Sequence, residues 1–242
     1  MTSNVLLELK EVHTHIGAYH ILHGVNLQIP RGELTLLLGR NGAGKTTTLR
    51  TIMGLWQASQ GTVNFNGHDI THMTTPDIAS LNIAYVPENM GIFSDLTVEE
   101  NMLLAARKAS HAQQMDAERL AWIYAMFPAV EKFWHHPAGK LSGGQKQMLA
   151  VARAMVEPRD LLIVDEPSKG LAPAIVQNMI DAFQTMKASG VSILLVEQNI
   201  HFADQLGDSV AVMDNGRVIH AGSMAALSAD PALQQSLLGL AL

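Results

Sequence analysis

Gly39-Arg40-Asn41-Gly42-Ala43-Gly44-Lys45-Thr46 decides the fold, because it fits the phosphate-binding loop (P-loop) pattern G-x-x-x-x-G-K-[ST]. The apolar run 34–38 predicts a buried strand before the loop, and residues 47–53 predict a helix after it. Such a loop aims backbone N–H groups and a helix N-terminus at one point, which attracts phosphate. Lys45 can reach the terminal phosphates of a nucleotide, and the Thr46 hydroxyl can bind Mg²⁺. The alternative is an ordinary glycine-rich turn with a solvated lysine. The residues expected to bind the nucleotide here are Gly39, Arg40, Asn41, Gly42, Ala43, Gly44, Lys45, Thr46 and Thr47.

Length and charge limit the class of protein. The 242 residues suit one α/β domain, or a domain with a subdomain inserted in it. The net charge is −6 and the basic residues are scattered, so we expect no nucleic-acid partner. No stretch approaches the ~18 consecutive apolar residues of a membrane span. Residues 1–8 lack the basic and apolar regions of a signal peptide, so the sequence predicts a cytoplasmic protein.

The hydrophobic pattern divides the chain into a core and an insertion. Alternating apolar and polar residues predict antiparallel strands at 6–12 and 25–29, and further strands are expected at 61–65 and 83–86. From Thr97 to about Val156 the pattern is helical, with a capping box at the start and a second helix at 115–127. We therefore expect a single domain, 1–242. Its nucleotide-binding core, with a β subdomain, covers 1–87 and 158–242, and a helical subdomain is inserted at 88–157.

A second helix N-terminus that can accept an anion follows the P-loop helix in the chain. Leu141-Ser142-Gly143-Gly144-Gln145 precedes a long helix that is expected to end near Val156. The first N–H groups of that helix have no intrahelical partner, as in the P-loop helix.

Two carboxylates end the apolar strand Leu161-Leu162-Ile163-Val164-Asp165-Glu166. In an open parallel sheet, ligands bind beyond the carboxyl ends of the strands. Asp165 can therefore hold Mg²⁺, and Glu166 can orient or deprotonate the water that attacks the γ-phosphate. The alternative is that the pair only caps the next loop. The pattern further predicts a helix through Met186, a strand 192–196 that ends at the same edge, a hairpin over 210–219 and a helical tail over 224–242.

The P-loop, the L-S-G-G-Q stretch and the acidic strand occur in the order found in the ATP-binding cassette (ABC) family, which this sequence resembles over nearly its whole length. The resemblance implies a RecA-like P-loop NTPase core, an antiparallel β subdomain, an inserted helical subdomain, and ATP with Mg²⁺ as cofactors. It also implies that two cassettes meet head to tail. Ser142 and Gly144 of one chain, with Gly143 and Gln145 of the same motif, would then bind the nucleotide held by Lys45 of the other. Residues 168–171 occupy the loop through which the two sites communicate.

Two positions depart from the common family pattern. Glu88 follows Tyr85-Val86-Pro87 where the family often has glutamine. Its carboxylate has either a role on the metal side of the site or a role in coupling. Gln198 replaces the usual switch histidine, so it can donate an N–H to a γ-phosphate oxygen but cannot become cationic. We still count Gln198, with Glu166 and Lys45, among the catalytic residues.

The residue that covers adenine is also unusual. The family commonly stacks an aromatic ring on the base at the position that Ile16 occupies here. Either Tyr19 or His15 stacks instead, or the apolar Ile16 covers the base alone. The alternative for Tyr19 is an ordinary half-buried tyrosine.

At these positions, and at Gly170-Leu171-Ala172-Pro173, the sequence resembles the ATP-binding subunits of branched-chain amino acid transporters. This implies an ATPase that energises an importer of branched-chain or related amino acids or amides. Asn89-Met90-Gly91 stands where that subgroup usually has a Gly-Arg pair, which leaves the solute open. The implied partners are a second cassette, transmembrane permease subunits that contact residues 88–101 and, indirectly, a solute-binding protein. The cassette pair is preferably a heterodimer, with a homodimer as the other possibility, and the chain would lie on the inner face of the membrane. The alternatives are the ATPase of a lipid or lipopolysaccharide export machine, a nucleotide-gated assembly or regulatory module outside transport, and a nucleotide-binding scaffold without turnover.

Overall fold

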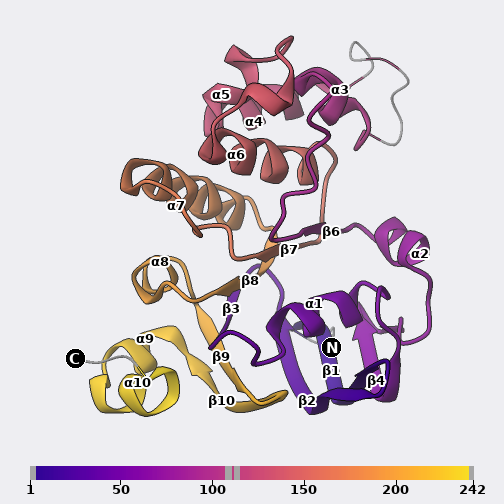
Figure 1. Ribbon diagram of the computed structural model, residues 1–242, viewed down its shortest axis with the longest axis vertical. Helices are drawn as coiled ribbons and strands as arrows, with labels where there is room; N and C mark the ends of the chain where they lie inside the picture. The colour runs from indigo at the N-terminus through magenta and orange to yellow at the C-terminus, as the bar shows by residue number, and fades with distance from the viewer. Residues whose placement is uncertain (1–3, 107–110, 112–114, 240–242) are drawn as a thin grey trace.

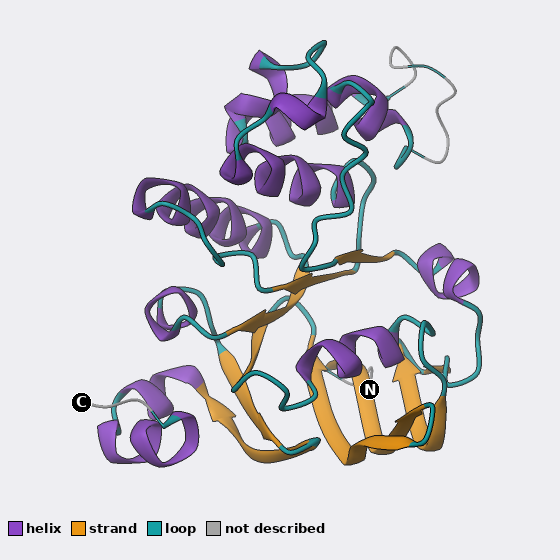
Figure 2. Ribbon diagram, viewed as in Figure 1, coloured by secondary structure: helices purple, strands orange, loops and turns teal. Residues whose placement is uncertain are grey.

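The computed structural model describes residues 4–106, 111 and 115–239. Predictions that concern residues 1–3, 107–110, 112–114 and 240–242 lie outside the described residues. Two sheets and several groups of helices make up the described chain (Figures 1 and 2).

The central sheet has the strand order β10-β9-β3-β8-β7-β6. Its strands are β3 (Leu34–Gly39), β6 (Ile83–Val86), β7 (Leu161–Asp165), β8 (Ser192–Glu197), β9 (Ser209–Asp214) and β10 (Arg217–Ser223). All neighbours pair in parallel except β10, which pairs antiparallel with β9 at one edge. Every residue of β3, β7 and β8 is buried, because both faces of a parallel sheet are covered. The P-loop strand β3 therefore lies inside the sheet. The strand β8, which carries Glu197, lies beside it, and β7, which carries Asp165, is the next strand along; both run in the same direction as β3.

The second sheet is antiparallel, with the order β2-β1-β4-β5. Its strands are β1 (Val5–Ile16), β2 (Tyr19–Pro30), β4 (Ala58–Phe65) and β5 (His68–Asp69). β1 and β2 form one long hairpin, so the strands predicted at 6–12 and 25–29 are too short. The alternation of apolar and polar residues breaks near Glu11, which has a positive φ of 48° within an irregular part of the register. Because of this break, the sequence pattern does not show that β1 continues to Ile16.

The helices form three groups around the sheets. Near the antiparallel sheet lie α1 (Lys45–Ile52) and α2 (Thr75–Ser80). At the top of Figure 1 lie α3 (Val98–Leu103), α4 (Ala117–Met126), α5 (Pro128–Lys132) and α6 (Gly143–Ala154), with the 3₁₀ turn η2 (Ala138–Lys140). The remaining helices are α7 (Pro173–Ala188), α8 (Ile200–Asp204), α9 (Met224–Ser228) and α10 (Pro231–Leu238). None of the helices within the described ranges is both long and apolar enough to cross a membrane.

Two hydrophobic clusters share the central sheet between them. Ile193 and Leu195 of β8 belong to the cluster that includes α6 and α7, whereas Leu194 and Val196 belong to the cluster that includes α1 and the antiparallel sheet. Successive strand residues point to opposite faces, so β8 buries both faces at once. This packing fixes the carboxyl ends of β3, β7 and β8 at one edge, where the candidate site lies.

Candidate functional site

The P-loop connects β3 to α1 with little space around it. A Cβ atom at Gly39 would clash with the carbonyl oxygen of Met213 on β9, so the loop requires glycine at this close approach. Lys45 is buried, and its Nζ donates to the carbonyl oxygens of Gly39, at 2.8 Å, and Arg40, at 3.1 Å. Burial lowers the pKa of Lys45, and the neighbouring carboxylate of Glu166 opposes this shift. The ammonium group is thus held over the phosphate-binding loop itself.

Asp165 and Glu166 end β7 next to the P-loop. Glu166 has a positive φ of 50°, and its N–H donates to the carbonyl oxygen of Val196 at 2.9 Å, which turns its side chain towards Lys45. Glu166 Oε1 lies 3.7 Å from Lys45 Nζ.

Asp165 has the properties of a metal ligand. Its two carboxylate oxygens are buried, and neither has a hydrogen-bond partner within 3.5 Å. Burial raises the pKa of Asp165, and the nearby Thr46 hydroxyl acts in the opposite direction. An unpartnered buried carboxylate beside a hydroxyl fits Mg²⁺, which prefers oxygen ligands.

Gln198 links three parts of the site. Its Nε2 donates to Asn41 Oδ1 in the P-loop at 2.9 Å and to Glu166 Oε1 at the end of β7. Gln198 itself follows β8, so one neutral amide joins the P-loop to two strand ends.

A cavity of about 320 Å³, the P-loop cavity, brings nine of the predicted site residues together. The residues that line it are Ile21, Asn41, Gly42, Ala43, Gly44, Lys45, Thr46, Thr47, Glu88, Glu166 and Lys169. Gly39 and Arg40 instead line a smaller hollow of about 150 Å³ that also contains Glu197 and Gln198.

Two lining residues were not predicted from the sequence. Ile21 lies in an irregular part of the β1–β2 register, where His20 pairs with His15 and Leu22 pairs with Thr14. This irregularity leaves Ile21 outside the regular pairing with β1, and the sequence shows no break in its pattern there. Lys169 lies in the loop 168–171, which the family resemblance identified as a whole without singling out this side chain.

Other predicted residues lie elsewhere. Ser142 and Gln145 form a capping box at the start of α6, in which the Ser142 N–H donates to Gln145 Oε1 at 2.9 Å. The four motif residues, Ser142, Gly143, Gly144 and Gln145, belong to the upper group of helices in Figure 1 and do not line the P-loop cavity.

The candidate adenine contacts also lie outside this cavity. Ile16 and Tyr19 are directly opposite each other at the end of the β1–β2 hairpin, and Tyr19 is 75% exposed. His15 stacks on His20 with a centroid distance of 4.2 Å, and its Nδ1 lies 3.1 Å from Ser59 Oγ. The stacking of His15 makes it the poorest of the three candidates for a base contact.

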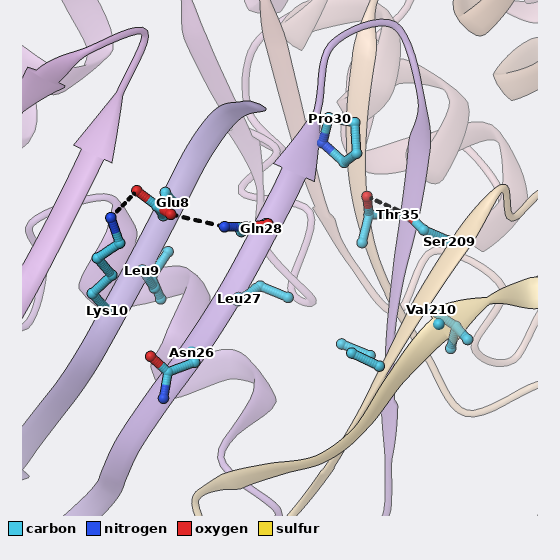
Figure 3. Close-up of a pocket in the computed structure, with 13 residues that line it drawn as sticks. Glu8, Leu9, Lys10, Asn26, Leu27, Gln28, Pro30, Thr35, Ser209 and Val210 are labelled. Atoms are coloured by element: carbon cyan, nitrogen blue, oxygen red, sulfur yellow. Dashed lines mark hydrogen bonds and ion pairs between the residues drawn. The ribbon is translucent and has the colours of Figure 1, made fainter. Parts of the chain in front are cut away.

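Two further pockets differ in their chemistry. The pocket in Figure 3, about 500 Å³, lies between the antiparallel sheet and β9, and the carboxylate of Glu8 there is paired with Lys10 at 2.7 Å and Gln28 at 2.8 Å. Its charges are therefore already satisfied. The other pocket, about 590 Å³, is lined by Arg50, Leu55, Trp56, Tyr85, Pro87, Glu88 and Asn89.

Comparisons with known proteins agree with this geometry. The sequence model of the family described as "ABC transporter" matches residues 22–169. The chain is 37% identical over 237 residues to the high-affinity branched-chain amino acid transport ATP-binding protein BraG of Pseudomonas aeruginosa, covering 97% of this chain and 100% of BraG. It is 36% identical to the probable branched-chain amino acid transport ATP-binding protein LivF of Archaeoglobus fulgidus, over 84% of this chain and 86% of LivF.

A solved structure extends the agreement to three dimensions. The structure of an ATP-binding subunit of an ABC transporter is 30% identical, has a TM-score of 0.81, and covers 97% of this chain and 96% of that one. These matches confirm the predicted fold class and the family resemblance. The chain therefore belongs to the ABC transporter family.

Proposed function

We propose that the chain binds and hydrolyses ATP and thereby energises an importer of branched-chain amino acids or related amino acids or amides. The observation that carries the proposal is the meeting of the P-loop, Glu166 and Gln198 at one edge of the sheet. The solute class is supported by BraG and LivF, whose names describe branched-chain amino acid transport.

In the proposed mechanism, the P-loop N–H groups and Lys45 hold the phosphates. Glu166 accepts the proton of the water that attacks the γ-phosphate, because its carboxylate opens on the P-loop cavity. Gln198 donates an amide N–H towards the same region and stays neutral at every physiological pH. Hydrolysis would therefore depend on one ionisable base, Glu166, without a cationic switch residue.

The cation that accompanies ATP would be held by Thr46, Asp165 and Glu88. The unpartnered oxygens of Asp165 support this choice. Mg²⁺ supplies positive charge that stabilises the charge developing on the phosphates. Ile16 and Tyr19 would cover the adenine at the end of the hairpin.

A second cassette would complete each site. Ser142, Gly143, Gly144 and Gln145 lie outside the P-loop cavity of their own chain, which supports binding to the nucleotide of a partner chain. The similarity to branched-chain amino acid transporters favours a different cassette as the partner, with a homodimer as the alternative. The division into a core, 1–87 with 158–242, and a helical subdomain, 88–157, would let the α6 start reach that partner.

The permease would dock beside the Glu88 loop. The pocket of about 590 Å³ there is lined by Trp56 and Tyr85, whose Nε1 and hydroxyl are buried and have no hydrogen-bond partner within 3.5 Å. Burial raises the pKa of Tyr85 to about 12, so its hydroxyl remains a donor. The exposed Leu55, with Arg50 and Glu88 in the same pocket, suits a docking segment with apolar side chains and polar groups. The chain would thus work on the cytoplasmic face of the membrane, with a solute-binding protein as an indirect partner.

Replacement of Glu166 with glutamine tests the proposal. We expect phosphate release, measured with the cassette subunit that co-purifies with the chain, to fall by about 10²-fold or more, because the general base is lost. ATP binding should stay within a few-fold of wild type. Glu118→Gln on the exposed surface of α4 is the matched control and should release phosphate at the wild-type rate. An unchanged rate for Glu166→Gln would remove the catalytic assignment.

A further inference from the structure

The side chain of Lys169 lies between two carboxylates that belong to different loops. Its Nζ is 2.6 Å from Glu88 Oε1, in the loop after β6, and 3.5 Å from Glu166 Oε2, at the end of β7. Lys45 approaches the other oxygen of Glu166 at 3.7 Å. Lys169 therefore connects the Glu88 loop to the proposed catalytic base and lines the P-loop cavity with both.

The charges around Lys169 are unevenly distributed. Asp165, Glu166 and Glu88 bring three carboxylates to this region, and the raised pKa of Asp165 includes repulsion from both glutamates. The hydrogen bond and charge of Glu88, with the charge of Glu166, raise the pKa of Lys169 and keep its ammonium group charged. Lys169 thus supplies the positive charge that offsets the two glutamates on the open side of the cavity.

The contact with Glu88 is easily exchanged. The side chains of Lys169 and Glu88 are 59% and 48% exposed. Exposed ion pairs contribute little to stability, because water and salt screen them and the long side chains lose conformational freedom. The pair can therefore separate at small cost when another cation competes for the carboxylates.

We propose that Lys169 is a positioning residue of the nucleotide site. Its ammonium group holds the Glu88 loop and the Glu166 carboxylate together in the nucleotide-free chain, and it gives way to the divalent cation that enters with the nucleotide. The inference rests on the proposed function, which assigns Glu88 to that cation. It adds a consequence for the loop 168–171: the arrival of the cation releases the side chain that ties this loop to the loop after β6.

Calorimetric titration with ADP, once with Mg²⁺ and once with EDTA, tests the role of Lys169. The measured quantity is the ratio of the Kd with EDTA to the Kd with Mg²⁺. In Lys169→Met the two glutamates lose their shared counter-charge, so Mg²⁺ should strengthen ADP binding more than in wild type. We expect the ratio to rise about three- to tenfold, as for one unit charge a few ångströms from the cation in a largely hydrated site. Lys169→Arg keeps the charge and should stay within about twofold of the wild-type ratio.

Lys187→Met is the matched control, because it removes one positive charge at a distant ion pair. Lys187 Nζ lies 2.9 Å from Asp208 Oδ1, away from the P-loop cavity. Its ratio should stay within about twofold of wild type, because screening weakens distant charges. Equal ratios for Lys169→Met and Lys187→Met would overturn the role of Lys169 and leave the proposed function intact. If the wild-type chain does not bind ADP, the proposed function fails. If it binds ADP equally well with EDTA, the cation assignment and the role of Lys169 both fail.

Discussion

Glu197 is a buried carboxylate that joins two of the loops around the site. Its Oε1 accepts the N–H of Ser168 at 2.9 Å, and its Oε2 accepts the N–H groups of Gln198, at 3.1 Å, and Asn199, at 3.2 Å. A single side chain thereby fixes the start of the loop that carries Lys169 and the backbone of Gln198.

Glu197→Gln should lower the free energy of unfolding by about 1–3 kcal/mol, because the amide NH₂ of glutamine would face a backbone N–H that has lost its acceptor. Urea denaturation at pH 7 measures the change. Glu118→Gln, at an exposed position, should change the same quantity by less than about 0.5 kcal/mol. Equal stability of wild type and Glu197→Gln would show that these backbone donors find other partners.

The pH dependence of this difference has a defined sign. Burial raises the pKa of Glu197 above its ordinary value, against the effect of the N–H donors. The folded state therefore binds the proton more tightly than the unfolded state, so the contribution of Glu197 to stability is greatest at low pH and falls as the pH rises through the folded pKa. The stability gap between wild type and Glu197→Gln should be larger at pH 5 than at pH 8.

For single residues, the sequence predicts the location of those at strand ends better than the location of those in loops. Asp165, Glu166 and Gln198 could be placed near the P-loop, because parallel strands bring their carboxyl ends to one edge. Ile21 and Lys169 could not, since their contacts depend on a register irregularity and a loop conformation. Glu197 ends β8 and could be placed at the same edge, but the hydrogen bonds of its buried carboxylate could not be predicted. The roles assigned to Ser142, Ile16, Tyr19 and Glu88 stay predictions.

Among the elements, α3 is tied to the loop before it by one buried side chain. Asn101 Oδ1 accepts the N–H of Phe93 at 3.0 Å, and its Nδ2 donates to the carbonyl oxygens of Phe93, at 3.0 Å, and Thr97, at 2.9 Å. Arg153 of α6 approaches the same Oδ1 at 3.4 Å. Asn101 thus connects two helices to the segment proposed to meet the permease.

Asn101→Ala should lower the free energy of unfolding by about 1–3 kcal/mol, because Phe93 loses both of its side-chain partners. Hydrogen exchange of the Phe93 amide should become at least about tenfold faster as its protecting acceptor is lost. Asn178→Ala, the same substitution at an exposed position of α7, is the control and should leave that exchange rate unchanged. If the Phe93 amide in Asn101→Ala exchanges as slowly as in wild type, Asn101 does not hold the loop before α3.

Two of the short helices were not predicted from the sequence. Helices α2 and α8 have six and five residues, too few to show a helical period, although Thr74 and Asn199 cap their N-termini. By contrast, the helices over 115–127 and after Ser142 were predicted to within a few residues, because each has a capping residue and an apolar face.

For the whole molecule, the feature that bears on pairing is the location of the N-terminus of α6. It lies in the upper group of helices, whereas the P-loop lies between the two sheets (Figure 1). The sequence contained both motifs, but only the assembled fold shows that Ser142 does not line the P-loop cavity of the same chain. This separation of the two helix N-termini supports the proposal that a second chain completes the site.

The pairing can be tested with Glu166→Gln, which should hold ATP without consuming it. By light scattering with Mg²⁺ and ATP, we expect this variant to stay monomeric alone and to form a two-cassette complex with the different cassette that co-purifies with it. ADP should not support the complex, because the Ser142–Gln145 motif of this chain is proposed to bind the γ-phosphate of the nucleotide that the partner cassette holds. Adding Ser142→Arg to the variant should weaken any ATP-dependent pairing whose interface uses that serine. A dimer of the variant alone with ATP would show instead that one chain supplies both halves, and the heterodimer preference would be wrong.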